Sequence, residues 1–189
     1  MIVMQYANNG SLLSYLHHNI NKLTWRMKLQ HLKDIAMYLY IMHVEGLVHC
    51  DLHGGNIVLN RYNTPLICDL GLSRSVNSHE SDSTIRGVLP FIAPEVLRTR
   101  KFTQKSDIYS FGIVMYLIAT GEPPFREWSF DKCLAMRVCE GLPDSAPEEY
   151  KKLAERCCDA DHDKRPHAVT LRYGICNIDK DNSKEYYLS

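Results

Sequence analysis

The sequence predicts a mostly α-helical (α+β) domain, a helical bundle with one short β-hairpin near its middle. Apolar residues recur every three or four positions over 24–45, and residues 107–120 are apolar on nearly every side. Two short β-type runs, 57–59 and 65–68, are separated by a polar turn. The chain has 189 residues, of which 45% are hydrophobic, so it can bury one good core.

The first elements are predicted from their caps and stops. Residues 1–6 form a short β-type run, and Ser11 can cap a short helix over 12–17. Thr24 is the predicted N-cap of the long helix, and Gly46 is the residue expected to end it. Because its apolar residues share one face, we expect this helix to lie in the core.

After the hairpin, loops and helices are predicted to alternate. The polar stretch 73–84 has no hydrophobic period and predicts a surface loop. Ser106 is the predicted N-cap of the helix over 107–120, which Gly121 ends. Further expected elements are a helical turn at 96–97, helices near 129–140 and 147–159, and a last short helix from Pro166.

Charge and cysteine content restrict the class of protein. The chain has 22 basic and 22 acidic residues, interspersed, which gives no electrostatic footprint for nucleic acid or an anionic membrane surface. Its seven cysteines are odd in number and form no Cys-x-x-Cys pair, which indicates reduced thiols in a cytoplasmic protein. No apolar run approaches the roughly 18 to 20 residues of a membrane span. The sequence does not indicate an oligomeric state.

Chemically capable side chains concentrate in the loop 49–60, between two apolar runs. Asp51 and Asn56 lie five positions apart, and Asp69 follows thirteen positions later, after the second β-type run. One base and two metal-holding oxygens would suffice for phosphoryl transfer. We therefore predict that this loop carries the active site.

Simpler interpretations of these residues remain open. A zinc site would use the ligand types present at His49, Cys50, Asp51 and His53, but neighbouring side chains would point in different directions, and no second ligand pair lies at useful spacing. Asp51 alone could be a turn-forming aspartate before a strand. Asp107 could be a simple charge or cap at a helix N-terminus.

Five motifs, in this order, resemble the C-terminal lobe of a eukaryotic protein kinase of the tyrosine-kinase-like serine/threonine group. They are a His-x-Asp loop with asparagine five residues on, Asp69-Leu70-Gly71, Ala93-Pro94-Glu95, Asp107-Ile108-Tyr109-Ser110-Phe111-Gly112, and Arg165-Pro166. The resemblance implies a partial kinase domain, hinge and C-terminal lobe, over 1–176, and a polar tail over 177–189. Since the chain begins where the N-terminal lobe would finish, the glycine-rich loop and its lysine are expected to be missing.

The resemblance implies roles for the loop residues. Asp51 would accept the proton of the substrate hydroxyl, and Asn56 and Asp69 would hold the magnesium ions that bridge the phosphates of ATP. His53 stands where serine/threonine kinases carry a catalytic lysine, and it can still donate a hydrogen bond. His49 would support the loop.

The resemblance also implies contacts that hold the loop and a site for the nucleotide. Asp107 would brace the backbone amides of the loop, and Glu95 would pair with Arg165. The residues expected around ATP are Met4 as gatekeeper, Gln5 and Ala7 in the hinge, Ser11 near the ribose and Val58 below the adenine.

The function implied is transfer of the γ-phosphate of ATP to Ser or Thr of a protein substrate. The expected absence of the N-terminal lobe leaves a pseudokinase or interaction module as one alternative. Three departures point the same way: Cys50 for the usual arginine, His53 for the usual lysine and Val88 for the usual threonine. Cys50 also argues against control by activation-loop phosphorylation. A second alternative is a small-molecule phosphotransferase of the aminoglycoside or choline kinase type, whose loop often reads His-x-Asp-Leu-His-x-x-Asn, as here.

Overall fold

The computed structural model describes residues 7–77, 87–124 and 140–185, with side chains described as far as residue 180. The predicted strand at 1–6 and nearly all of the predicted helix at 129–140 lie outside the described residues. The helices are α1 Leu12–Asn19, α2 Trp25–Val44, α3 Pro94–Thr99, α4 Gln104–Thr120, α6 Glu148–Cys157 and α7 Ala168–Glu185. The strands are β1 Leu47–Val48, β2 Ile57–Leu59, β3 Pro65–Ile67 and β4 Arg74–Ser75. Short 3-10 turns lie at Ile20–Lys22, Leu70–Leu72, Leu89–Phe91 and His162–Lys164.

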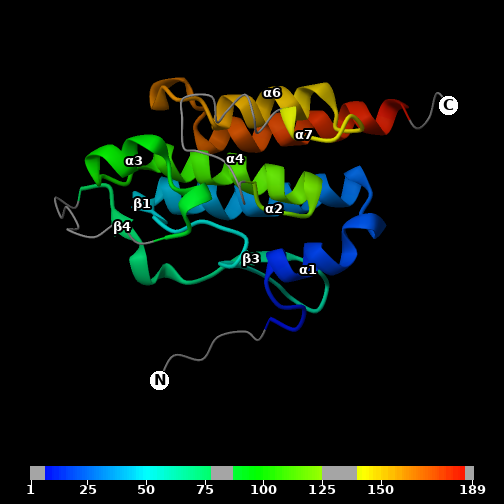
Figure 1. The fold of residues 1–189 in the computed structure, drawn as a ribbon, viewed down its shortest axis with the longest axis horizontal. Helices are drawn as coiled ribbons and strands as arrows, with labels where there is room; N and C mark the ends of the chain where they lie inside the picture. Colours follow the sequence, from blue (N-terminus) through cyan, green and yellow to red (C-terminus); the bar gives the residue numbers. More distant parts are fainter. Residues whose placement is uncertain (1–6, 78–86, 125–139, 186–189) are drawn as a thin grey trace.

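Helices α2 and α4 run across the centre of the molecule. In Figure 1, α6 and α7 cover one side of this pair, and α1 with the short strands lies on the other side. The contacts between elements agree, since α7 packs on α2, α6 packs on α4, and α1 packs on β2. The expected mostly helical fold with a small hairpin is confirmed. The two central helices therefore separate a purely helical layer from the layer that carries the polar loop.

The predicted caps of α1 and α2 are confirmed. The Ser11 hydroxyl accepts a hydrogen bond from the Ser14 backbone N–H at 3.3 Å, and the Thr24 hydroxyl accepts one from the Met27 N–H, also at 3.3 Å. α1 continues two residues past the expected end at residue 17. On α2, the residues at three- and four-residue spacing are buried as predicted, namely Leu29, Leu32, Ile35, Ala36 and Leu39.

The cap of α4 differs from the prediction. Thr103, not Ser106, is the N-cap, and the helix therefore begins at Gln104. The Thr103 hydroxyl accepts from the Ser106 N–H at 3.2 Å, while the Ser106 hydroxyl accepts from the Thr103 N–H at 2.9 Å. This reciprocal capping box needs both side chains, so Ser106 serves as its third helical residue. Gly121 ends the helix as predicted, in a left-handed conformation with φ +88°.

The strands form two separate antiparallel pairs. The predicted hairpin is confirmed, since β2 pairs with β3 with Ile57 opposite Ile67. A second pair was not predicted: β1 pairs with β4, with Val48 opposite Arg74. The prediction of a surface loop over 73–84 is therefore wrong at Arg74 and Ser75, which form a strand, and residues 78–84 lie outside the described residues. A strand of two residues is too short to show the alternation that reveals strands in a sequence.

The last helix is much longer than predicted. α7 continues unbroken to Glu185, whereas the sequence suggested a short helix and an irregular tail from 177. Leu171, Ile175 and Ile178 lie on its buried side, at spacings of four and three residues. Lys33 on α2 forms an ion pair with Asp179 on α7. These contacts hold the helix against α2 past residue 177.

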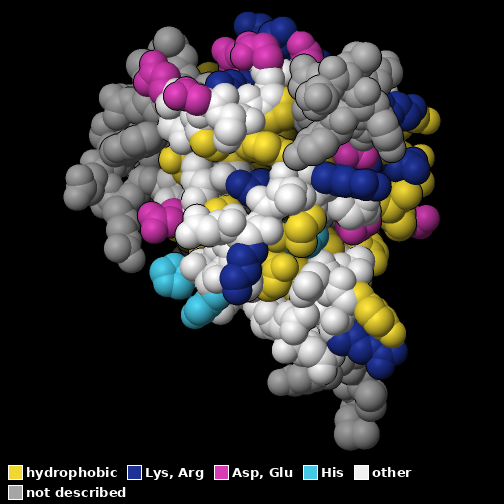
Figure 2. Space-filling model, turned by 90° about the vertical axis from the view of Figure 1, so that its right-hand side faces the viewer, with side chains coloured by type: hydrophobic (Ala, Val, Ile, Leu, Met, Phe, Trp, Pro, Cys, Tyr) yellow, Lys and Arg dark blue, Asp and Glu magenta, His cyan; other side chains and the backbone are white. Residues whose placement is uncertain are grey.

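The surface carries mixed charges. On the face that Figure 2 shows, Lys and Arg side chains are interspersed with Asp and Glu side chains, in agreement with the zero formal charge. Among the helices described, none combines the length and the apolar character that a membrane crossing requires.

Candidate active site

A buried carboxylate on α4 holds the start of the polar loop. Asp107 is 1% exposed, and its two oxygens accept hydrogen bonds from the backbone N–H groups of His49, at 2.8 Å, and Cys50, at 3.1 Å. Asp107 is the fourth residue of α4 and does not cap it. The predicted bracing of the loop by Asp107 is therefore confirmed.

His43 on α2 belongs to the same contact and was not predicted. Its Nε2 lies 3.0 Å from Oδ2 of Asp107, and its side chain is 8% exposed. Gln104 donates to the His43 carbonyl at 2.7 Å, which ties the end of α2 to the start of α4. In the sequence, His43 falls within the apolar stripe of the long helix, where a single histidine carries no signal of such a contact.

Cys50 turns the chain just before Asp51. It has φ +69°, a left-handed conformation that is costly for a residue with a side chain. Burial, and next the nearby Asp107 carboxylate, raise the pKa of the Cys50 thiol to about 12. The thiol is thus neutral and donates weakly to the Val48 carbonyl at 3.6 Å. The strained turn is kept in place because Asp107 accepts from the Cys50 N–H.

His49 connects the loop to the segment that leads to Asp69. The side chain is fully buried, its Nδ1 accepts from the Asp51 N–H at 3.2 Å, and its Nε2 faces the Cys68 carbonyl at 3.3 Å. Since Nδ1 accepts, the ring proton resides on Nε2 and is donated to Cys68. The expectation that His49 supports the loop is confirmed by these contacts.

Asp51, His53 and Asn56 lie together. The Asn56 amide donates to the backbone carbonyl and to Oδ2 of Asp51, both at 2.9 Å. The other Asp51 oxygen, Oδ1, lies 3.6 Å from Nε2 of His53. Nδ1 of His53 accepts from the Gly55 N–H at 3.0 Å, so the ring proton on Nε2 is directed towards Asp51. Burial lowers the pKa of His53, although Asp51 acts in the opposite direction, and the ring is neutral at pH 7.

Asp69 follows the hairpin in a left-handed conformation, with φ +58°. Its carboxylate is exposed and accepts from the Gly71 N–H at 3.3 Å. The preceding residue, Cys68, donates its N–H to the Asn56 carbonyl at 2.9 Å, so Asp69 and Asn56 are attached to the same hairpin. The Asn56 amide nitrogen is engaged by Asp51, which leaves the side-chain oxygen as its donor for a cation.

The four candidate zinc ligands do not converge. The Cys50 thiol faces the Val48 carbonyl, and both ring nitrogens of His49 contact other groups of the chain. Across the described parts of the chain, no group of three or more His, Cys, Asp or Glu side chains is arranged to hold a metal ion.

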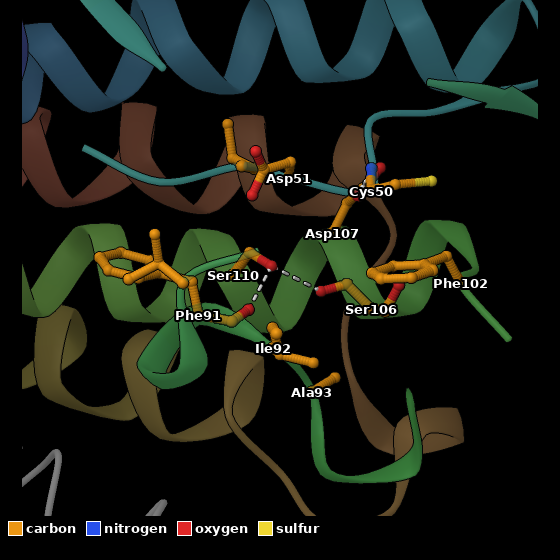
Figure 3. Close-up of a pocket in the computed structure, with 11 residues that line it drawn as sticks. Cys50, Asp51, Phe91, Ile92, Ala93, Phe102, Ser106, Asp107 and Ser110 are labelled. Carbon is orange, nitrogen blue, oxygen red and sulfur yellow. Dashed lines mark hydrogen bonds between the residues drawn. The ribbon is translucent and has the colours of Figure 1, made fainter. Parts of the chain in front are cut away.

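The segment 87–93 closes over the other side of Asp51. Gly87 has φ +133°, and a Cβ built there would lie 3.1 Å from Asp51 Oδ1, so only glycine fits this conformation and this approach. In Figure 3, Ser110 lies between Asp51 on one side and Phe91 and Ile92 on the other. The Ser110 hydroxyl lies 2.7 Å from the Phe91 carbonyl. The cavity left between these residues measures about 10 Å³, no more than one water molecule.

A buried ion pair holds α3 to the rest of the domain. Nη1 and Nη2 of Arg165 donate to the two oxygens of Glu95 at 2.6 and 2.8 Å, as predicted from the sequence. Arg165 is 1% exposed, and it also donates to the carbonyls of Asp159, at 2.8 Å, and Lys105, at 3.0 Å. The bidentate contact with Glu95 and the two carbonyl partners together satisfy the hydrogen-bond donors of the buried guanidinium.

The predicted nucleotide residues are only partly described. Met4 and Gln5 lie outside the described residues, and Ala7 is half-buried at the start of the described part. Ser11, which precedes α1, forms an isolated β-bridge with Val58 on β2, so these two predicted nucleotide contacts lie side by side. Val58 is half-buried, whereas Ile57 and Leu59 on the opposite face of β2 are buried.

Comparison with known proteins agrees with this geometry. The family model for protein tyrosine and serine/threonine kinases matches residues 1–175. A protein of Acanthamoeba polyphaga mimivirus, described as a serine/threonine-protein kinase/receptor, is 33% identical over 87% of this chain and 10% of its own length. A Dictyostelium discoideum protein described as a serine/threonine-protein kinase is 30% identical over 87% of this chain and 13% of its own length.

A third relative is the dual specificity protein kinase shkA of Dictyostelium discoideum, 32% identical over 83% of this chain and 32% of its own length. The chain thus spans no more than about a third of any of these three relatives. Because the family model covers nearly all of the sequence, and the buried contacts of Asp107, Glu95 and Arg165 connect the motifs as expected, the chain belongs to the protein tyrosine and serine/threonine kinase family.

Proposed function

We propose that this chain carries the catalytic loop of a protein kinase that transfers the γ-phosphate of ATP to Ser or Thr hydroxyls of a protein substrate. The observation that supports it most is the contact of Asn56 with Asp51, in which one amide holds both the carbonyl and one carboxylate oxygen. This leaves Oδ1 of Asp51 for an incoming hydroxyl. Asp69 follows on the same hairpin.

In this proposal Asp51 accepts the proton of the substrate hydroxyl as it attacks. Asn56 fixes the carboxylate, and the braced amides of His49 and Cys50 fix the backbone before it. His53 presents a neutral N–H beside Asp51 and would orient either the carboxylate or the transferred phosphate. Positioning of this kind supplies a large part of the rate enhancement in phosphoryl transfer.

The donor set fits a magnesium ion. The Asn56 side-chain oxygen and the exposed Asp69 carboxylate are the hard oxygen ligands that Mg²⁺ prefers, and the ion needs few protein ligands because it keeps several waters. When bound with ATP, the ion would neutralise charge on the phosphates. Ala7, Ser11 and Val58, with Met4 and Gln5, are the proposed contacts of the nucleotide. We also propose a cytoplasmic location, as the cysteine usage suggests.

The same site bears on the two alternative functions, a pseudokinase or interaction module and a small-molecule phosphotransferase. Neutral Cys50 and His53, where the family carries basic side chains, favour a pseudokinase or interaction module. The loop pattern favours a small-molecule phosphotransferase, but the family match is to protein kinases, and the Glu95–Arg165 pair holds α3 as a platform beside the site.

A transfer assay on the natural full-length protein tests the proposal. Radiolabelled ATP and a mixed set of Ser- and Thr-containing proteins should yield labelled protein, and Asp51→Asn should lower the rate by about 10²- to 10⁴-fold because it removes the base. The matched control is Asp163→Asn. The Asp163 side chain is 83% exposed and lies in the turn before Arg165, far from Asp51 in the sequence. Binding of Mg-ATP without transfer would favour the interaction module, and labelling of an aminoglycoside or choline would favour the small-molecule enzyme.

A further inference from the structure

A larger pocket opens beside His53, and Asp51 is not among its lining residues. Its volume is about 290 Å³. It lies between the start of α1, the polar loop, the 88–91 segment and the end of α4. The lining residues are Leu13, His53, Gly54, Gly55, Val88, Pro90, Phe91, Leu117, Pro123 and Pro124.

The lining that the described residues provide is almost entirely apolar. None of these residues is Asp, Glu, Lys or Arg, and the one titratable group is His53. Burial lowers the pKa of His53, so the ring is uncharged at pH 7, and it lies 5.9 Å from the Phe91 ring between centroids. A charged side chain in this pocket would lose hydration and find no charged partner among the described lining residues.

Close backbone packing gives the pocket its floor. A Cβ at Gly54 would lie 2.4 Å from Cδ2 of Leu117, and one at Gly55 would lie 2.7 Å from Cε1 of His53. The Leu13 N–H donates to the Gly54 carbonyl at 3.1 Å, which fixes the opposite wall. Gly54 therefore allows the loop to lie directly on α4, and Gly55 leaves room for the ring of His53.

The pocket and the candidate active site share residues. His53 lies 3.6 Å from Asp51 and also lines the pocket. Val88 and Phe91 line both this pocket and the small cavity beside Asp51. Leu13 and Val88 are 39% and 43% exposed, so apolar surface faces water immediately next to the proposed base.

We propose that this pocket takes one apolar side chain, aliphatic or aromatic, of a bound protein chain whose hydroxyl lies at Asp51, and so selects the substrate. This inference rests on the proposed function. Pockets for drug-sized ligands measure roughly 300 to 1,000 Å³ and carry several converging polar groups. Here the volume is smaller and one imidazole is the main polar side chain, which suits a single side chain of a longer chain better than a complete small molecule.

Peptide binding to the full-length protein tests the pocket without requiring catalysis. A set of serine peptides would be prepared in which each position flanking the serine is, in turn, Phe, Leu, Asp or Lys, with the rest of the peptide unchanged. Each peptide would be titrated into the protein while the Leu methyl signals are followed by NMR. At one position, Phe and Leu should bind about tenfold or more tightly than Asp and Lys, which is the discrimination one apolar pocket provides. The signals of Leu13 and Leu117 should shift together with saturation.

Leu13→Lys places a charge on the wall of the pocket without filling the core. This variant should weaken binding of the Phe peptide by about tenfold. It should make the Asp peptide the better ligand, because the new ammonium group pairs with the Asp carboxylate. The matched control is Val169→Lys on α7, which is also 39% exposed and does not line the pocket. It should leave the preference for Phe unchanged.

The outcomes separate this inference from the proposed function. Equal binding of all four peptides, or Leu117 signals that do not respond to the Phe peptide, overturns the pocket, even if Asp51-dependent transfer is present. A Phe preference that Leu13→Lys reverses supports the pocket even if no phosphate is transferred, and in that case the proposed function fails. A preference that Val169→Lys changes equally would also overturn it.

Discussion

The two halves of α4 are equally buried and hold the domain together in different ways. From Gln104 to Phe111 the helix buries Ser106, Asp107 and Ser110, and each of them makes a hydrogen bond to another segment or cap. From Gly112 to Thr120 it buries mainly hydrocarbon, including Ile113, Val114, Met115, Leu117 and Ile118. The apolar half resists unfolding by packing, whereas the polar half also determines where the loops lie. Burial and positioning are therefore separate tasks on one helix.

The largest effect is expected at the ion pair beside the polar half. Arg165→Ala leaves Glu95 buried without its partner, and it also removes donors to the carbonyls of Lys105 and Asp159. Loss of one partner of a buried pair costs about 3–5 kcal/mol of unfolding free energy. Urea unfolding followed by circular dichroism measures it. Lys152→Ala, which breaks the exposed pair with Glu149, should give no resolvable change in unfolding free energy. A loss as large as that of Arg165→Ala would contradict the distinction between buried and exposed ion pairs.

A slightly smaller effect is expected in the apolar half. Ile113 is fully buried, and Ile113→Ala should cost about 2–5 kcal/mol through lost burial and the cavity left behind. Because the hydrocarbon side chain of Ile113 cannot hydrogen-bond to a loop amide, the change should lower global stability without selectively loosening the polar loop. Hydrogen exchange can separate these outcomes. Selective fast exchange of the His49 and Cys50 amides in this variant would show that the apolar half of α4 also positions the loop, contrary to the contrast drawn above.

Asp107→Asn provides the complementary test in the polar half. The amide keeps the shape of the carboxylate but has one acceptor oxygen instead of two, so one of the His49 and Cys50 N–H groups loses its partner. We expect a loss of about 1.5–3 kcal/mol, the range for hydrogen bonds to a charged group, and faster exchange of those two amides than of the α4 core. Asp163→Asn is the exposed control. Unchanged exchange at both amides would show that Asp107 does not position the loop.

The smallest effect concerns the thiol beside Asp107. Burial and Asp107 raise the Cys50 pKa to about 12, from 9.0 in the absence of these effects. The folded state therefore keeps the proton while the unfolded state loses it, and this group contributes stability that is lost as pH rises from 9 towards 12. At pH 9, iodoacetamide should alkylate native Cys50 more than about tenfold more slowly than in urea, as measured by mass spectrometry. Equally fast alkylation would place the thiol in water instead.

Local signals in the sequence predicted much of this arrangement. Caps at Ser11 and Thr24, the apolar stripe of α2, the hairpin and the Glu95–Arg165 pair all follow from spacing or from ordered motifs. Features that depend on distant partners did not. The β1–β4 pair joins two-residue strands far apart in the chain, and α7 extends because it packs on α2.

The candidate site shows the same division. Asp51, Asn56 and Asp69 could be proposed from the sequence because they stand at fixed spacing on one loop and hairpin. His43 could not, since its contact with Asp107 depends on how α2 crosses α4. The pocket next to His53 also could not, because its walls come from four segments that meet only after folding.

The hydrogen bond from Cys68 to Asn56 has a consequence for cation affinity. Asn56 belongs to the loop and Asp69 follows the hairpin, and the 2.9 Å bond between the Cys68 N–H and the Asn56 carbonyl closes the chain between them. The backbones of the two proposed ligand residues are therefore tethered to one another before any ion arrives. The conformational entropy of bringing them together is lost during folding of the hairpin and is not subtracted from the free energy of binding. A cation at this position would meet a preorganised chelate.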